Sequence, residues 1–190
     1  LIQIEPLLDA LPKKSMNAVA VTDVCNFFAV VKFFQAAVVS GVKPILGCDL
    51  FCHSPEKPEI HSSLVLLCQN EQGYRNLTRL VSKAYQEGQY NGQPRVHHAW
   101  IPDHADGLIA LSGGRSGAIG KALLADDEQT ANQLAADFKR LFPNRFYIEI
   151  QRTGRPDESI YNERVIRLAE RLNLPLVATN DVRFLDQEDF

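Results

Sequence analysis

The chain has 190 residues, 45% of them hydrophobic, and a formal net charge of −3 at neutral pH. This is the composition of an ordinary globular domain with a sizeable core, and it excludes a disordered chain. The negative balance argues against a domain whose main task is gripping nucleic-acid phosphates, and no apolar run reaches the roughly 18 residues that a membrane span needs.

The first quarter of the chain predicts a helix, a strand and a second helix. Apolar residues at helical spacing predict the first helix over 4–15. Small and β-branched residues predict a buried strand over 18–22, and the second helix follows over 27–40. The second helix is apolar nearly all round, so we expect it to be buried on most sides. Its apolar residues include Phe28, Val31, Phe34 and Val38.

The next segment predicts two strands around a turn. A strand is expected over 43–50, and the proline-containing, charged stretch 53–60 predicts a surface loop or hairpin turn. The continuous apolar run 63–68 predicts a strand covered on both faces. A helix is expected to begin at an Asn70 cap, and residues 86–95 predict an irregular loop.

Strands and helices keep alternating to the end of the chain. The predicted strands lie at 107–111, 146–150 and 176–178, and the predicted helices at 116–124, 128–141 and 158–172. This alternation predicts a mainly parallel sheet flanked by helices, either open or closed as a barrel.

Two strand ends carry carboxylates. Asp23 follows the strand at 18–22, and Asp181 follows the strand at 176–178. Open α/β sheets and barrels bind and react at the C-terminal ends of their strands, so the two carboxylates are candidates for one site. The alternative is that each Asp only caps a helix or turns a loop. With Asp49, these carboxylates could hold Mg²⁺ weakly, but they would make a poor zinc site.

Other candidate groups give weaker signals. The run 112–117, Ser-Gly-Gly-Arg-Ser-Gly, could cradle a phosphate, but it lacks the established glycine spacings and a tight strand-to-helix turn is favoured. His97 and His98 are adjacent and would point to opposite faces of an extended chain. The four cysteines form no CxxC pair, which favours neither zinc nor disulfides and predicts a reducing compartment such as the cytoplasm.

Six phrases in order resemble a known family. They lie at 21–23, 41–47, 73–77, 107–112, 146–149 and 177–184. Together they resemble the PHP (polymerase and histidinol phosphatase) domain at the N-terminus of bacterial DNA polymerase III alpha subunits, most closely the proteobacterial replicative type. The resemblance covers essentially the whole chain and implies a distorted (β/α)₇ barrel with metal ligands at its strand ends.

The resemblance also implies that residues 1–190 are a single-domain fragment. Metal-binding members begin with a strand ending in His-x-His, and Leu1 falls just after that segment. We therefore expect the first barrel strand to be missing, together with the polymerase palm and fingers downstream. A barrel without one strand would leave two unpaired edges, which invite dimerisation or aggregation.

The chain departs from the family pattern at several ligand positions. Val24 stands where the pattern has histidine, Gly114 where it has cysteine, and Arg183 where it has histidine. Ser63 replaces another histidine, although His61 lies two residues upstream with the same strand parity. The resemblance thus assigns a vestigial site to Asp23, Asp49, Ser63, Gly114, Glu149, Asp181 and Arg183, with the role of Glu149 open.

The expected function is a degenerate, metal-free PHP domain without catalytic residues. A multinuclear phosphoesterase site needs several nitrogen and carboxylate donors, which Val24 and Gly114 cannot supply. Arg183 could instead pair with Asp23 or Asp181. The resemblance implies a scaffold that docks the epsilon exonuclease subunit within the polymerase III holoenzyme. The parent chain would be a DNA-directed DNA polymerase, a nucleotidyltransferase that uses Mg²⁺ and binds DNA.

Two other functions remain open. An active metal-dependent PHP phosphoesterase, either a proofreading nuclease or a histidinol-phosphatase-like enzyme, would use Asp23, Asp49 and Asp181, with His61 as a substitute ligand. A sugar-phosphate barrel enzyme would use the run 112–117 and bind a small phosphate ester saturably.

Overall fold

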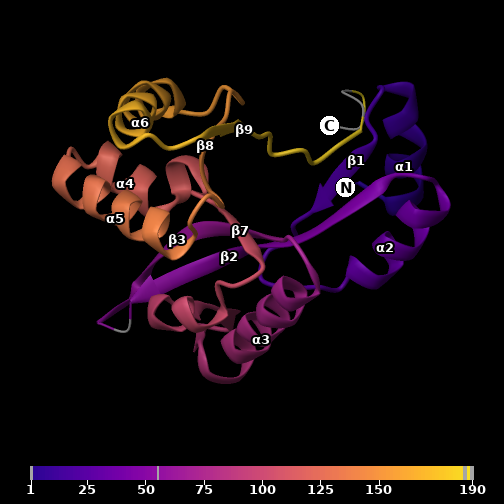
Figure 1. Ribbon diagram of the computed structural model, residues 1–190, viewed down its shortest axis with the longest axis horizontal. Coiled ribbons are helices and arrows are strands. Elements are labelled where there is room, and N and C mark those ends of the chain that lie inside the picture. Colours follow the sequence, from indigo (N-terminus) through magenta and orange to yellow (C-terminus); the bar gives the residue numbers. More distant parts are fainter. Residues whose placement is uncertain (1, 55, 186–187, 189–190) are drawn as a thin grey trace.

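The computed structural model describes residues 2–54, 56–185 and 188, which form a mixed α/β fold (Figure 1). The first elements are α1 (Ile4–Lys13), β1 (Ala18–Val21), α2 (Val30–Val39), β2 (Lys43–Ser54), β3 (Lys57–Cys68) and α3 (Glu71–Glu87). Three short strands follow: β4 (Gln89–Tyr90), β5 (Gln93–Pro94) and β6 (Val96–His97). The last elements are β7 (Leu108–Leu111), α4 (Ala118–Leu124), α5 (Glu128–Leu141), β8 (Phe146–Ile150), α6 (Glu158–Leu172) and β9 (Leu176–Ala178).

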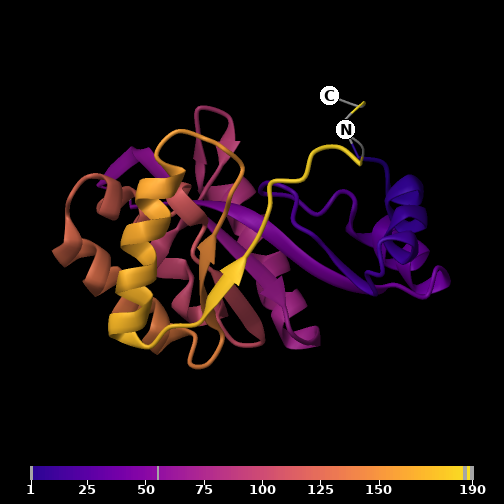
Figure 2. The ribbon, with the colours of Figure 1, turned by 90° about the horizontal axis from the view of Figure 1, so that it is seen from above.

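The main sheet curls into an open half-barrel. Its strand order is β1-β2-β3-β7-β8-β9, with β6 paired to β2. Four pairings are parallel and two, β2 with β3 and β3 with β7, are antiparallel, so the sheet is mainly parallel as expected. Among the described strands this order begins at β1 and ends at β9, and Figure 2 shows the sheet left open between them. The fold is the expected α/β barrel in an incomplete form.

The stretch 53–60 lies in a hairpin, one of the two predicted alternatives, but the strands extend further into it than expected. β2 and β3 are each 12 residues long, and their ladder continues to the pair His53 and His61. The polar composition does not reveal the length of these strands. The end of the hairpin lies beyond the core, so its polar side chains stay solvated while its backbone remains paired.

β2 and β3 are covered on one face, whereas both faces of 63–68 were expected to be covered. Cys48, Leu50 and Cys52 alternate with less buried residues, and Leu64 and Leu66 do the same on β3. The buried face packs on α3, which lies below the two strands in Figure 1. The opposite, concave face of the half-barrel is only half-buried, and it carries the candidate site.

The two strands expected to end at the site are also less buried than predicted. The residues of β1 are half-buried or exposed, and the exposed residues of β9 include Leu176. The physical reason is their place in the sheet, because an edge strand has a neighbour on one side only.

The second helix differs most from expectation. α2 is shorter than 27–40, and its buried residues are Val30, Phe33 and Ala37. Phe33 and Ala37 pack with α1 in a small core cluster separate from the main one. The residues expected to be buried, Phe28, Val31, Phe34 and Val38, are exposed instead. α1 and β2 cover only the inner side of this helix.

Several local predictions hold. The Asn70 side chain caps α3 by accepting from Gly73 N–H at 3.0 Å. α5, β8, α6 and β9 have the predicted bounds, and on α6 Tyr161 is buried whereas its neighbour Ile160 is exposed. The loop expected over 86–95 contains a small hairpin, because positive φ at two residues, Asn91 (50°) and Gly92 (75°), permits a tight turn. No helix in the described part of the chain is long and apolar enough to cross a membrane.

Candidate functional site

The site lies on the concave face, where the segment after β1 runs beside β2. Asp49 N–H donates to the Asp23 carbonyl at 3.2 Å, and Cys25 N–H donates to the Asp49 carbonyl at 2.9 Å. Asp23 therefore joins the site through its backbone. Asp49 lies opposite Val65 on β3, in the same ladder as Ser63.

Asp49 carries a carboxyl group that is costly to ionise. Its Oδ1 atom is buried and, within the described part of the chain, has no hydrogen-bond partner. Burial, reinforced by the charges of Glu149 and Asp181, raises its pKa to about 6, against the opposing effects of the Ser63 hydroxyl and Arg183. These five side chains, which come from four parts of the sequence, thus act on one another electrostatically.

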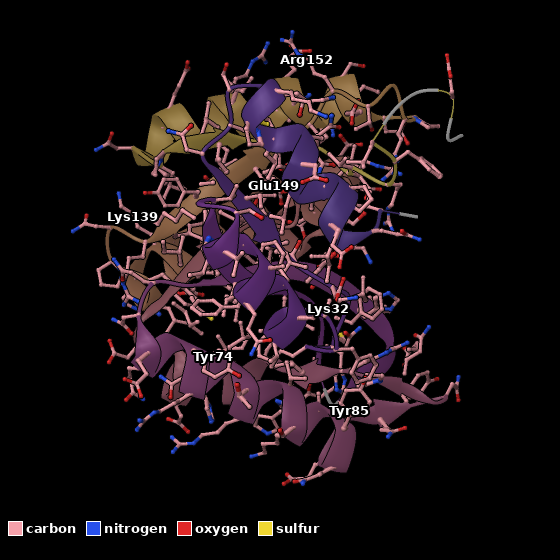
Figure 3. All side chains as sticks on the ribbon, turned by 90° about the vertical axis from the view of Figure 1, so that its right-hand side faces the viewer. Lys32, Tyr74, Tyr85, Lys139, Glu149 and Arg152 are labelled. Atoms are coloured by element: carbon pink, nitrogen blue, oxygen red, sulfur yellow. The ribbon has the colours of Figure 1, made fainter. Side chains whose placement is uncertain are left out.

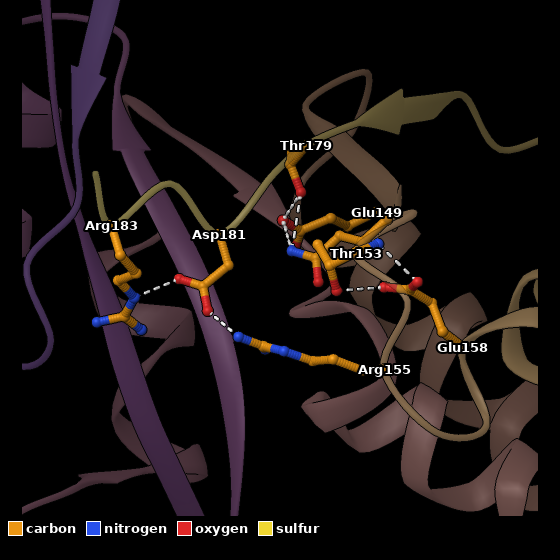
Figure 4. Close-up of polar contacts among 8 residues, drawn as sticks. Glu149, Thr153, Arg155, Glu158, Thr179, Asp181 and Arg183 are labelled. Atoms are coloured by element: carbon orange, nitrogen blue, oxygen red, sulfur yellow. Dashed lines mark hydrogen bonds and ion pairs between the residues drawn. The ribbon is translucent and has the colours of Figure 1, made fainter. Parts of the chain in front are cut away.

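Glu149 is held from several sides on β8. Its carboxylate accepts a hydrogen bond from the Thr179 hydroxyl (Figure 4). It accepts a second one from the Gln151 amide at 3.5 Å. Its backbone N–H donates to the Ser112 hydroxyl at 2.9 Å, and its carbonyl accepts from the Tyr161 hydroxyl at 2.7 Å. Burial raises the pKa of Glu149 despite the hydrogen bonds that its carboxylate accepts.

Asp181 is clamped between two arginines. Arg183 Nε donates to Oδ1 at 2.7 Å, and Arg155 forms an ion pair with Oδ2 (Figure 4). Burial alone would raise the pKa of Asp181, but the two guanidinium groups outweigh it and hold the pKa below its ordinary value. Of the two partners proposed for Arg183, the structure therefore selects Asp181 rather than Asp23.

Arg155 is the functional residue that sequence reasoning missed. It lies in the turn between β8 and α6, which is shaped by Glu158. The Glu158 carboxylate accepts from the backbone N–H groups of Thr153 at 2.6 Å and Gly154 at 2.9 Å. This turn brings Arg155 to Asp181, 26 positions later. The sequence signal was weak, because Arg155 lies five positions after the predicted strand 146–150 and Arg152 is nearer to it.

The run 112–117 forms a tight strand-to-helix turn, as favoured from the sequence. A Cβ at Gly113 would lie 2.2 Å from the Ser63 carbonyl oxygen, and one at Gly117 would lie 1.8 Å from the Ser112 carbonyl oxygen. Glycine is needed because the turn packs directly on β3. Gly114 belongs to this turn and offers the site no side-chain donor.

His61 does not substitute for a lost ligand in this arrangement. Its ring packs on Phe51, with ring centroids 4.6 Å apart, on the hairpin beyond Ser63. Burial and the nearby charges of Arg95 and Lys121 lower its pKa.

The residues that meet here do not fit a multinuclear metal centre. Among the described residues, no group of three or more His, Cys, Asp or Glu side chains could hold a metal ion. Both oxygens of Asp181 face guanidinium groups, and an oxygen of Glu149 accepts neutral hydrogen bonds. The structure brings together Asp49, Ser63, Glu149, Asp181 and Arg183. This arrangement ties the segment after β9 to β8 and to the turn that follows it.

Comparison with known proteins identifies relatives of the chain. The sequence profile of the PHP domain matches residues 1–153. The chain is 46% identical over 190 residues to the DNA polymerase III subunit alpha of Pseudomonas aeruginosa and 44% identical to that of Haemophilus influenzae, each match covering 100% of this chain and 16% of the relative. It is 41% identical over 185 residues to the Escherichia coli K12 subunit, covering 97% of this chain and 16% of the relative.

Two solved structures share the fold. A protein from Bifidobacterium adolescentis named as a metal-dependent phosphoesterase matches with a TM-score of 0.56 and 12% identity, over 94% of this chain and 81% of that one. An amidohydrolase from Chromobacterium violaceum, solved with bound sulfate and no metal, matches with a TM-score of 0.54 and 13% identity, over 99% and 84% of the two chains. At this level of identity the likeness concerns the fold alone.

Proposed function

Because the chain belongs to the PHP domain family, we propose that it is the PHP domain of a replicative DNA polymerase III alpha subunit, acting as a metal-free scaffold rather than a phosphoesterase. The observation that carries the scaffold role is the clamp on Asp181. A carboxylate that would face a metal ion in an active family member binds two guanidinium groups here. This ion-pair network holds strand ends together where a metal cluster otherwise would.

The proposal extends to the parent protein, since the chain spans 16% of the length of its curated relatives. The parent chain would synthesise DNA on a DNA template with Mg²⁺ at a separate palm domain. The present domain would brace that polymerase and dock the epsilon exonuclease subunit of the holoenzyme. These activities would place the parent protein in the bacterial cytoplasm.

Metal content tests the proposal. The full-length alpha subunit and its Asp181→Asn variant are purified with added zinc and manganese, and bound metal is measured by elemental analysis. We expect well below one ion per chain in both proteins, together with retained epsilon binding in a co-purification assay. Ions that persist in the variant are bound elsewhere, which makes the variant a matched control.

The rival function is an active phosphoesterase, and one observation favours it. The unpartnered Oδ1 of Asp49 is the kind of buried donor that an ion could satisfy. About two or three tight ions that disappear in Asp181→Asn would establish this rival. Hydrolysis of a small phosphomonoester that stops on adding a chelator would establish it independently.

A further inference from the structure

The outward side of α2 is an exposed apolar surface. We call the α2 outer face the set of Phe28, which lies just before the helix, and Val31, Phe34, Val38 and Val39. Phe28 is 84% exposed, Val31 62% and Val39 89%. Figure 3 looks at the molecule from this side, with Lys32 marking the helix. Lys32 and Gln35 are the polar side chains of α2 itself.

This helix has the composition of a buried helix. A surface helix normally shows one apolar stripe and an opposite polar face, whereas a helix that is apolar all round lies inside a larger protein. In α2 the inner side already has a cover, because Val30, Phe33 and Ala37 are buried, and the last two pack in the small core with α1. The α2 outer face therefore needs a second cover, and contiguous exposed apolar residues mark such a contact.

Two observations indicate which part of the protein packs on the α2 outer face. The chain spans 16% of the length of its relatives, so under the proposed function most of the parent chain lies outside this structure. The extended segment 179–185 runs from β9 across to the side of α1, on the same lobe as α2 (Figures 1 and 2). The parent chain would thus continue on the side of the molecule that carries the uncovered helix.

The size of the surface favours a tethered partner. α2 has ten residues, whereas a free-standing interface involves roughly 20–30 residues on each side. A small apolar contact is sufficient when both halves belong to one polypeptide, because the tether raises their effective concentration. A second copy of the chain or a separate subunit would need a larger surface.

We propose that the α2 outer face packs against the polymerase portion of the same parent chain. This inference rests on the proposed function and names the surface through which the domain braces the polymerase. The test uses the full-length alpha subunit with Val31→Asp and Val38→Lys combined. The charges are chosen to suit the two ends of the helix dipole, so α2 itself is not weakened. Ile160→Asp, at an exposed apolar residue in the first turn of α6, is the matched control.

The readouts are limited proteolysis between the two portions, DNA synthesis, epsilon binding and oligomeric state. A charge buried in an apolar contact opens that contact, so we expect cleavage to be at least about tenfold faster in the double variant and unchanged in the control. Unchanged cleavage in the double variant would overturn the inference. So would loss of epsilon binding alone, or dissociation of a dimer, because another partner would then cover α2. Failure of the wild-type chain to synthesise DNA or bind epsilon would instead refute the proposed function.

Discussion

Replacing Asp49 by Asn should stabilise the fold at neutral and alkaline pH. Burial, reinforced by the charge of Glu149, raises the pKa of Asp49 from 3.8 to about 6. The difference corresponds to roughly 3 kcal/mol of unfolding free energy as an upper value, at about 1.4 kcal/mol for each tenfold change in proton affinity. The amide has the same shape, and its oxygen can still accept from the Ser63 hydroxyl.

The sign follows from proton binding. Between about pH 4 and 6 the folded state holds the Asp49 proton more tightly than the unfolded chain does, so wild-type stability falls as pH rises through this window. Asp49→Asn has no such proton. We expect the two proteins to be about equally stable below pH 4 and the variant to gain up to about 3 kcal/mol above pH 6.

Urea unfolding across this pH range measures the difference, with Trp100, the single tryptophan, as the fluorescent probe. A variant no more stable than wild type at pH 8 would refute the reasoning. A stability difference that does not change with pH would refute it too, because the effect would then not come from ionisation.

Three further substitutions test the site and its supports by urea unfolding. Arg183→Leu removes one of the two ion pairs with Asp181. Because the Arg183 side chain is 58% exposed, we expect the free energy of unfolding to fall by at most about 1 kcal/mol, and by less in high salt. A larger loss that does not depend on salt would contradict this. Gly113→Ala should cost about 2 kcal/mol or more, since φ is 76° and the new Cβ would lie 2.2 Å from a β3 carbonyl oxygen. Gly154→Ala is its control, with φ 77° but nothing within 4 Å, and an equal cost at both positions would show that the contact is unimportant. Tyr161→Phe leaves a β8 carbonyl without its buried partner and should cost about 1–3 kcal/mol, which a neutral result would exclude.

The parts of the fold that sequence predicted well depend on local chemistry. α5 and α6 follow the spacing of their apolar residues, and the Asn70 cap fixes the start of α3. The pairing of Arg183 with Asp181 can also be predicted from the sequence, because the two residues are two positions apart and have opposite charge.

The parts that sequence missed depend on distant neighbours. The burial of β1 and α2 was overestimated because apolar composition reports what a segment can bury, whereas the structure shows what covers it. The length of the β2–β3 hairpin comes from backbone pairing, which polar side chains do not prevent. Arg155 reaches Asp181 only through the turn that Glu158 holds, and neither residue matches a motif.

The charge balance of the site supports the proposed metal-free role. Its charged groups are three carboxyls, Asp49, Glu149 and Asp181, and two guanidinium groups, Arg155 and Arg183. With Asp49 protonated, the remaining two carboxylates balance the two arginines. Above the Asp49 pKa of about 6 the cluster carries one excess negative charge. Ionising Asp49 then costs free energy, because its Oδ1 is buried and has no hydrogen-bond partner among the described residues. Adding a divalent cation would instead place positive charge beside two arginines. Under the proposed function, Arg183 stands where the family pattern has histidine, and its ion pair with Asp181 would take the place of a bond to a metal ion.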